Sequence, residues 1–275
     1  MADTIQTVTA STRTDAPAFL GSRWNGWAVF ALAVLCIGCF VLVQTAGFII
    51  IFLHQHPEIL RQRIIPAHLQ SELRDPNFIT NLLTAKNLWL LSVTSEVALA
   101  VATLFLARMA FGASTRSLGV GVAAKPAQLR TGALMGAILF VGSALLVSIQ
   151  THFFGPHPQP QALALTKHHG AFDFLLDLMS VCIVAPLAEE IFFRGFVFAG
   201  LAQRMAPMYA IGISAVIFGL AHWERWSFLP IFLIGVGLAW LYYRMQTLWP
   251  NILAHATVNT ISLVIAYVAP QFVKS

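Results

Sequence analysis

Seven long apolar runs, nearly free of charged residues, constrain this chain more than any other feature of its sequence. An apolar helix needs about 20 residues to cross the hydrocarbon layer of a membrane. Strand patterns that alternate over about ten residues, as in outer-membrane barrels, are absent. Because only helices and closed barrels satisfy every backbone polar group in lipid, the sequence predicts an all-α fold, a polytopic membrane helical bundle with about seven transmembrane helices. The runs cover residues 27–53, 88–110, 131–150, 174–203, 208–223, 228–243 and 249–268.

The composition agrees with an integral, multi-pass membrane protein. Only 10% of the residues are Asp, Glu, Lys or Arg and 58% are hydrophobic, and the mean hydropathy is +0.76. The net charge of +5 comes from basic residues scattered among the loops, whereas nucleic-acid binding needs a basic stripe or patch. We therefore expect the lipid bilayer as a partner and no nucleic acid.

The N-terminal residues and one later loop bear on membrane orientation. The first 23 residues are polar and lack the basic start and short apolar core of a cleaved signal peptide. The first run is therefore expected to act as an uncleaved anchor. Cytoplasmic loops carry an excess of Lys and Arg, and the loop at 108–130 has basic residues but no acidic ones. This pattern predicts a cytoplasmic N-terminus.

The spans and loops divide the chain into four parts. Residues 1–26 form a polar N-terminal tail, 27–171 hold the N-terminal transmembrane helices, 172–268 carry the chemistry and 269–275 form a C-terminal tail. Within the second part, the loop 54–87 mixes charges with apolar residues at near-helical spacing, as interfacial helices do. It is predicted to lie along the membrane surface. Its apolar residues are Ile59, Leu60, Ile64, Ile65, Leu69 and Leu73.

Gly132 and Gly136 stand at G-x-x-x-G spacing in the third run. Small residues at this spacing let two helix backbones approach each other in a membrane. The pair therefore predicts close helix packing.

Two carboxylates and an arginine interrupt the fourth run, in the segment PLAEEIFFRG. A charge near the bilayer centre costs roughly 3 to 10 kcal/mol, so it usually faces a wet or protein-lined interior. Glu190 and Arg194 are four residues apart, which places them on one helix face and predicts a charge-assisted pair. Glu189 is turned away by about 100° and has no cation nearby in the sequence. Pro186 removes one helix hydrogen bond and predicts a kink beside the carboxylates.

Two later runs each contribute a histidine. The segment FGLAHW places His222 one turn after Phe218, and NILAHATVN places His255 and Asn259 four residues apart on one face. Carboxylates, imidazoles and an amide on three helices suit the activation of a water molecule, with or without a metal. Peptide hydrolysis fits this set best, although the signatures H-E-x-x-H, G-x-G-D and G-x-S-x-G of other proteases are missing.

Three motifs in order, Pro-x-x-Glu-Glu-x-x-x-Arg-Gly, Phe-x-x-x-His and His-x-x-x-Asn, resemble those of the CPBP intramembrane protease family. That family includes the CAAX prenyl endopeptidases and bacterial bacteriocin-processing or immunity proteins. The resemblance makes 172–268, about a third of the chain, a CPBP-like catalytic core. It implies a protein of the bacterial cell (inner) membrane that hydrolyses a peptide bond of a membrane-presented protein or peptide.

The resemblance also implies a role for each matching residue of the fourth and fifth runs. Glu189 would be the general base that acts on the water. Glu190 and Arg194 would hold the site together. His222 would coordinate or orient the water.

The last run would complete the site with His255 and Asn259, the latter as an oxyanion donor. Members of the family are classed either as metalloproteases, usually with zinc, or as glutamate-dependent enzymes. Glu189, His222 and His255 match a known type of zinc ligand set, yet the same groups can serve without a metal. The residues leave both versions open.

All these groups should meet at one cavity if they activate one water. We expect the carboxylate of Glu189, the rings of His222 and His255 and the amide of Asn259 to lie within about 12 Å of one another. Helix rise puts His222 about 21 Å along its run and His255 only about 9 Å along a similarly directed one. A tilted or broken helix must therefore bring them to one depth.

Alternatives to proteolysis also remain open from the residues. The Glu-Glu-Arg cluster can be a buried ion pair that only fixes helix packing. Buried Glu and His chains also serve proton-coupled transporters, and Glu96 in the second run would extend such a relay. A non-catalytic immunity or scaffold protein would keep the motifs for stability. The sequence carries no signal for oligomeric state or for a prenyl group on the substrate.

Overall fold

The computed structural model describes residues 24–62, 67–75, 78, 84–166 and 170–274. Within these ranges the regular structure is helical throughout, which confirms the predicted all-α membrane bundle. Six helices are long and apolar enough to cross a membrane. Each of the seven predicted runs coincides with a helix or a helical series: α1 (Gly26–Gln55), α5 (Ala85–Phe111), α6 (Pro126–Phe154), the series α8 to α10, α11 (Pro207–Ala221), α12 (Phe228–Met245) and α13 (Trp249–Val268).

Helix α11 is the exception in length. Its 15 residues rise about 22 Å, less than the roughly 30 Å of a bilayer's hydrocarbon core. The helix ends where His222 forms its C-cap. The fifth run is therefore apolar along its whole length but too short to span the membrane as one straight helix.

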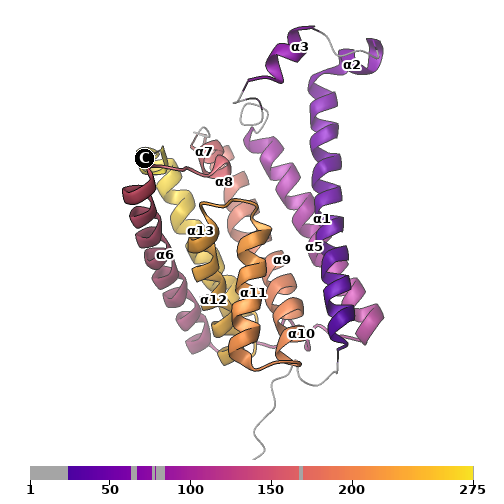
Figure 1. Cartoon of the computed structure of the whole chain (residues 1–275), viewed down its shortest axis with the longest axis vertical. Coiled ribbons are helices and arrows are strands. Elements are labelled where there is room, and N and C mark those ends of the chain that lie inside the picture. Colours follow the sequence, from indigo (N-terminus) through magenta and orange to yellow (C-terminus); the bar gives the residue numbers. More distant parts are fainter. Residues whose placement is uncertain (1–23, 63–66, 76–77, 79–83, 167–169, 275) are drawn as a thin grey trace, which may run out of the picture.

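The helices form two groups that meet at the fourth run (Figure 1). Helices α1 and α5 pack along each other at one edge, while α6 packs on α13 and α12, and α11 packs on α12. The fourth run contacts α5 on one side and α11, α12 and α13 on the other. Its central position brings its charged residues into reach of both groups.

The fourth run is one continuous series of helical segments with two wide π-helical turns. It consists of α8 (Ala171–Met179), η2 (Ser180–Val184), α9 (Ala185–Glu190), η3 (Ile191–Phe198) and α10 (Ala199–Ala202). Pro186, near the start of α9, has no amide hydrogen to give the carbonyl of Cys182 four residues earlier. The π-helical segments η2 and η3 flank α9, and every residue of η3 is buried, while the kink predicted at Pro186 stays a prediction.

The segments outside the bundle are short helices. Two of them, α2 (Pro57–Gln62) and α3 (Ala67–Glu72), follow the far end of α1 (Figure 1), within the loop predicted to be interfacial. Ile64 and Ile65 of that loop, and residues 1–23 of the predicted N-terminal tail, lie outside the described residues. Helix α7 (Pro160–Leu165) precedes α8, and α14 (Gln271–Lys274) falls in the predicted C-terminal tail.

The two glycines at G-x-x-x-G spacing bring α6 against α13. A Cβ atom at Gly132 would lie 2.3 Å from the carbonyl oxygen of Pro250, and one at Gly136 would lie 2.4 Å from that of Ala254. No side chain fits at such distances without moving the backbone of α13. The predicted close packing is confirmed, and it holds α13, the helix that carries His255, against α6.

Gly136→Ala is expected to destabilise the protein by about 1 to 3 kcal/mol, because overpacking forces α6 and α13 apart. Gly212→Ala on α11 is the matched control, since a Cβ there meets no atom within 4 Å and alanine is the better helix former. Unfolding of both variants in detergent micelles, followed by circular dichroism, measures the difference. Equal loss of stability in the two variants would contradict the packing argument.

Candidate functional site

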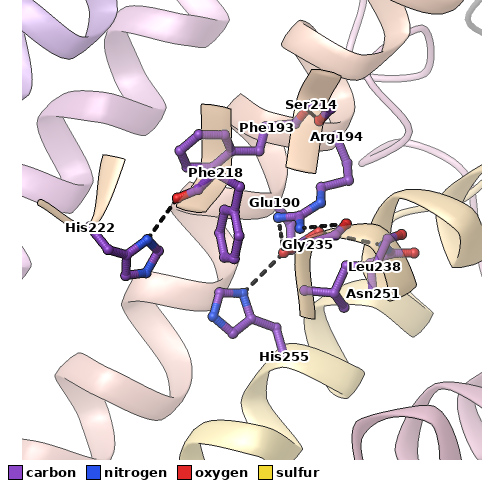
Figure 2. A network of polar contacts seen from close by, with 10 residues as sticks. All are labelled: Glu190, Phe193, Arg194, Ser214, Phe218, His222, Gly235, Leu238, Asn251 and His255. Atoms are coloured by element: carbon purple, nitrogen blue, oxygen red, sulfur yellow. Dashed lines mark hydrogen bonds and ion pairs between the residues drawn. The ribbon is translucent and has the colours of Figure 1, made fainter. Parts of the chain in front are cut away.

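The carboxylate of Glu190 lies at the centre of a buried polar network (Figure 2). Arg194 donates from Nη1 to Oε1 of Glu190 over 2.8 Å, and Nδ1 of His255 lies 3.0 Å from the same oxygen. The amide nitrogen of Asn251 lies 3.5 Å from the other oxygen, Oε2. Glu190 and Arg194 are both completely buried. The structure thus contains the Glu190–Arg194 pair that the sequence predicted, and α13 supplies two further partners.

Arg194 connects this network to the helices on the other side. Its Nη2 donates to the carbonyl of Gly235 on α12 over 3.5 Å. Its guanidinium carbon lies 4.3 Å from the ring centroid of Phe218 on α11, which is a cation–π distance. One side chain therefore links the fourth run with α11 and α12.

His222 and His255 pack against the same aromatic ring (Figure 2). The ring centroid of Phe218 lies 4.8 Å from that of His222 and 5.8 Å from that of His255. Phe218 stands one turn before His222 on α11, and its ring also meets His255 of α13. The structure brings the two imidazoles to one region, with a phenylalanine between them.

The hydrogen bonds of the two histidines set which ring nitrogen remains free to accept a proton. Nδ1 of His222 lies 2.8 Å from the carbonyl oxygen of Phe218, and a carbonyl only accepts, so Nδ1 carries the hydrogen. Nδ1 of His255 likewise faces a carboxylate oxygen of Glu190. In the neutral imidazoles, Nε2 of both histidines therefore keeps its lone pair.

Glu189 lies outside the network of its neighbour. Its side chain is half-buried, and its Oε2 is enclosed without any hydrogen-bond partner among the described residues. An adjacent residue on a helix is turned by about 100°, and Glu189 interacts electrostatically with Glu96 of α5 while Glu190 faces α13. Glu189 thus has an unused acceptor oxygen.

Asn259 connects α13 to the η2 segment of the fourth run. Its amide nitrogen donates to the carbonyl of Val181 in η2 over 2.7 Å. This contact occupies one of the two N–H groups of the amide and leaves the other. The predicted role as an oxyanion donor rests on that second N–H and stays a prediction.

The candidate zinc ligands Glu189, His222 and His255 do not form a ligand set in this arrangement. Across the described ranges, no three His, Cys, Asp or Glu side chains lie together as metal ligands. His255 is directed at Glu190, and the ring of Phe218 packs between the two histidines. The geometry of these three residues does not fit a three-residue zinc site.

Asn251 is the network member that the sequence analysis missed. It is completely buried, donates to the carbonyl of Leu238 over 2.6 Å and approaches Glu190. It stands four residues before His255, the spacing that places two side chains on one helix face. That spacing was a usable signal, and the same segment shows it again between His255 and Asn259.

Fold and site together define a polytopic helical membrane protein with a buried Glu–Arg–His cluster at the meeting point of its helices. Residues 171–261 match the Rce1-like family, described as "Type II CAAX prenyl endopeptidase Rce1-like". This match covers almost the same residues as the resemblance to the CPBP family and contains all three motifs. That resemblance is thereby confirmed for this part of the chain.

Two curated proteins are similar over parts of their length. The chain is 38% identical over 78 residues to "Putative membrane peptidase YdiL" of Bacillus subtilis (strain 168), which covers 28% of this chain and 32% of that protein. It is 28% identical over 103 residues to "UPF0177 protein YxdF" of Lactococcus lactis subsp. lactis (strain IL1403), covering 35% of this chain and 56% of that protein. The matches thus span less than two thirds of either relative. No solved structure matches the chain.

Proposed function

We propose that this protein is an intramembrane endopeptidase that hydrolyses a peptide bond of a membrane-presented protein or peptide. The proposal rests on one observation: two adjacent carboxylates differ in their hydrogen-bond partners. Glu190 is engaged by Arg194 and His255, whereas Glu189 keeps an enclosed oxygen without a partner. A general base needs a free acceptor. The match to an endopeptidase family supports the same reading.

In the proposed mechanism, the carboxylate of Glu189 takes a proton from a water molecule. The water oxygen attacks the carbonyl carbon of the scissile peptide bond, and Nε2 of His222 accepts a hydrogen bond that orients the water. The second N–H of Asn259 stabilises the oxyanion of the tetrahedral intermediate. Glu189 then passes its proton to the nitrogen of the scissile bond as the oxyanion collapses and the C–N bond breaks, which releases the amine and the new carboxyl end and regenerates the carboxylate of Glu189.

Glu190 contributes by positioning its neighbours. Its ionised carboxylate, paired with Arg194, fixes the hydrogen on Nδ1 of His255 and thereby the orientation of that imidazole. Such a network holds η3 and α13 together around the proposed site. The alternative that the Glu-Glu-Arg cluster is only a structural ion pair therefore accounts for Glu190 and Arg194. It leaves Glu189 without a role.

Cleavage by purified wild-type protein in liposomes tests the proposal. A library of membrane-anchored peptides, each made with and without a prenyl group, is incubated with these liposomes, and mass spectrometry identifies new peptide ends. We expect new ends at a restricted set of sequences. The two versions of each peptide decide whether prenylation is needed. If the liposomes take up protons or a solute along a gradient and no new peptide ends are found, the protein is a transporter and not a protease.

Whether the protein is a zinc-dependent protease can be measured separately. Because the three candidate ligands do not lie together, we expect purified active protein to contain well under one equivalent of zinc and to keep cleaving after dialysis against a chelator. Metal analysis of wild type and His222→Ala provides the comparison. One equivalent of zinc in wild type that disappears in His222→Ala would establish the metalloprotease version instead.

A further inference from the structure

A second carboxyl group lies buried beside Glu189. Glu96, in α5, is only 7% exposed, and its Oε2 is enclosed with no hydrogen-bond partner among the described residues. Helix α5 packs against α9, which carries Glu189. The two carboxyl groups are close enough to repel each other when both are charged, and Oε2 of Glu189 also has no partner.

The other charged and titratable groups on the helices that pack against α5 have partners of their own or lie further along those helices. Helix α5 packs on α1, α8, η2, α9 and η3. Of these, α1 carries Cys36, which interacts with Thr103 further along α5. Asp177 of α8 accepts a hydrogen bond from Tyr267, and η2 carries Cys182, a small thiol.

The cation that acts on this pair is Arg194 of η3, which is hydrogen-bonded to Glu190. Its guanidinium also attracts the charge of Glu189. The charged group that acts on Glu96 is the carboxylate of Glu189. Of the two carboxyl groups, Glu189 is thus the one with a cation acting on it, so the donor role in the pair is assigned to Glu96.

Two carboxyl groups this close in a largely dry interior favour sharing one proton, because two desolvated like charges are costly. A neutral carboxyl has one O–H to donate, and an ionised one only accepts. One hydrogen bond between Glu96 and Glu189 satisfies a donor and an acceptor that otherwise stay buried without partners. Burying either group unpaired is costly, so this bond is the favoured state of the pair.

We propose that Glu96 is a positioning residue for Glu189, whose carboxylate it holds by donating a hydrogen bond from its own neutral carboxyl group. The inference rests on the proposed function of Glu189 as the base. Glu96 keeps its proton through the reaction, since the proton from water goes to Glu189 and then to the leaving amine. Its effect is to fix which oxygen of Glu189 faces the water.

Two substitutions of Glu96 separate hydrogen bonding from size and charge. Glu96→Gln keeps an N–H donor of the same length, so we expect kcat within about threefold of wild type. Glu96→Met keeps the volume but has no donor, so we expect kcat to fall about 10- to 100-fold with KM unchanged, the loss of one hydrogen bond to a charged group. Thermal unfolding in detergent checks that both variants stay folded.

Infrared spectroscopy tests the same pair without any substrate. Wild type at neutral pH should show the absorption band of a protonated carboxylic acid, and Glu96→Gln should lose it. A band that persists unchanged in Glu96→Gln would overturn the proposal. This result stands even if no peptide is cleaved, so it separates failure of the inference from failure of the proposed function.

The kcat values of the two Glu96 variants also test the proposal. Wild-type kcat in Glu96→Met would remove Glu96 from the positioning of Glu189. A kcat as low in Glu96→Gln as in Glu96→Met would show that Glu96 acts through its charge or a transferable proton, which contradicts a neutral donor.

Discussion

Glu189→Gln is expected to lower kcat for peptide cleavage by about 100-fold or more while leaving thermal unfolding unchanged. The amide has the shape of the carboxylate but cannot take a proton from water at neutral pH. Stability should stay close to that of wild type, because Oε2 of Glu189 has no other partner among the described residues and the side-chain oxygen of glutamine can still accept the hydrogen bond proposed from Glu96. Cleavage rates and melting curves of the two purified proteins in the same liposomes and detergent measure both quantities.

Glu190→Gln is the matched comparison on the neighbouring residue. It removes the charge that pairs with Arg194 and His255, so its main effect should be a loss of stability rather than of kcat alone. Opposite signatures in two adjacent glutamates would distinguish a base from a structural partner. A Glu189→Gln variant that cleaves as fast as wild type removes Glu189 from the chemistry and leaves the transporter and scaffold readings.

The helices were predictable because lipid imposes a length and a composition on each of them. All seven runs coincide with helical segments, and the glycines at G-x-x-x-G spacing mark the contact of α6 with α13. The fifth run, 208–223, was itself only 16 residues long, close to the 15 residues of α11, but hydropathy did not show that the helix ends before His222. Its apolar run continues through Trp223, and hydropathy does not register where the backbone leaves the helix.

Within the site, contacts along one helix were predictable and contacts between helices were not. Glu190 and Arg194 were paired from their spacing alone, and the structure contains that pair. His255 turned out to contact Glu190, and Glu96 to neighbour Glu189. These partners are far apart in the sequence, and periodicity on one helix says nothing about the rotation of another. Such contacts depend on packing, here of α5 and α13 on either side of α9.

Arg194→Met should destabilise the folded protein by about 3 to 5 kcal/mol, because it leaves the charge of Glu190 buried without its cation. Methionine nearly preserves the volume, so a cavity contributes little. Arg194 is completely buried and also contacts Gly235 and the ring of Phe218, so those contacts change with it. Unfolding in mixed micelles with increasing amounts of a denaturing detergent measures the free-energy change.

A double variant, Glu190→Gln with Arg194→Met, isolates the buried charge as the cause. Removing both partners of a buried ion pair is often close to neutral, whereas removing one is costly. We therefore expect the double variant to regain most of the stability that Arg194→Met loses, with His255 and Asn251 still able to hydrogen-bond the glutamine. If the double variant is as unstable as the single one, the loss comes from packing around Phe218 rather than from an unpaired charge. Recovery of stability without recovery of cleavage would show that the pair serves the arrangement of the site beyond the stability of the fold.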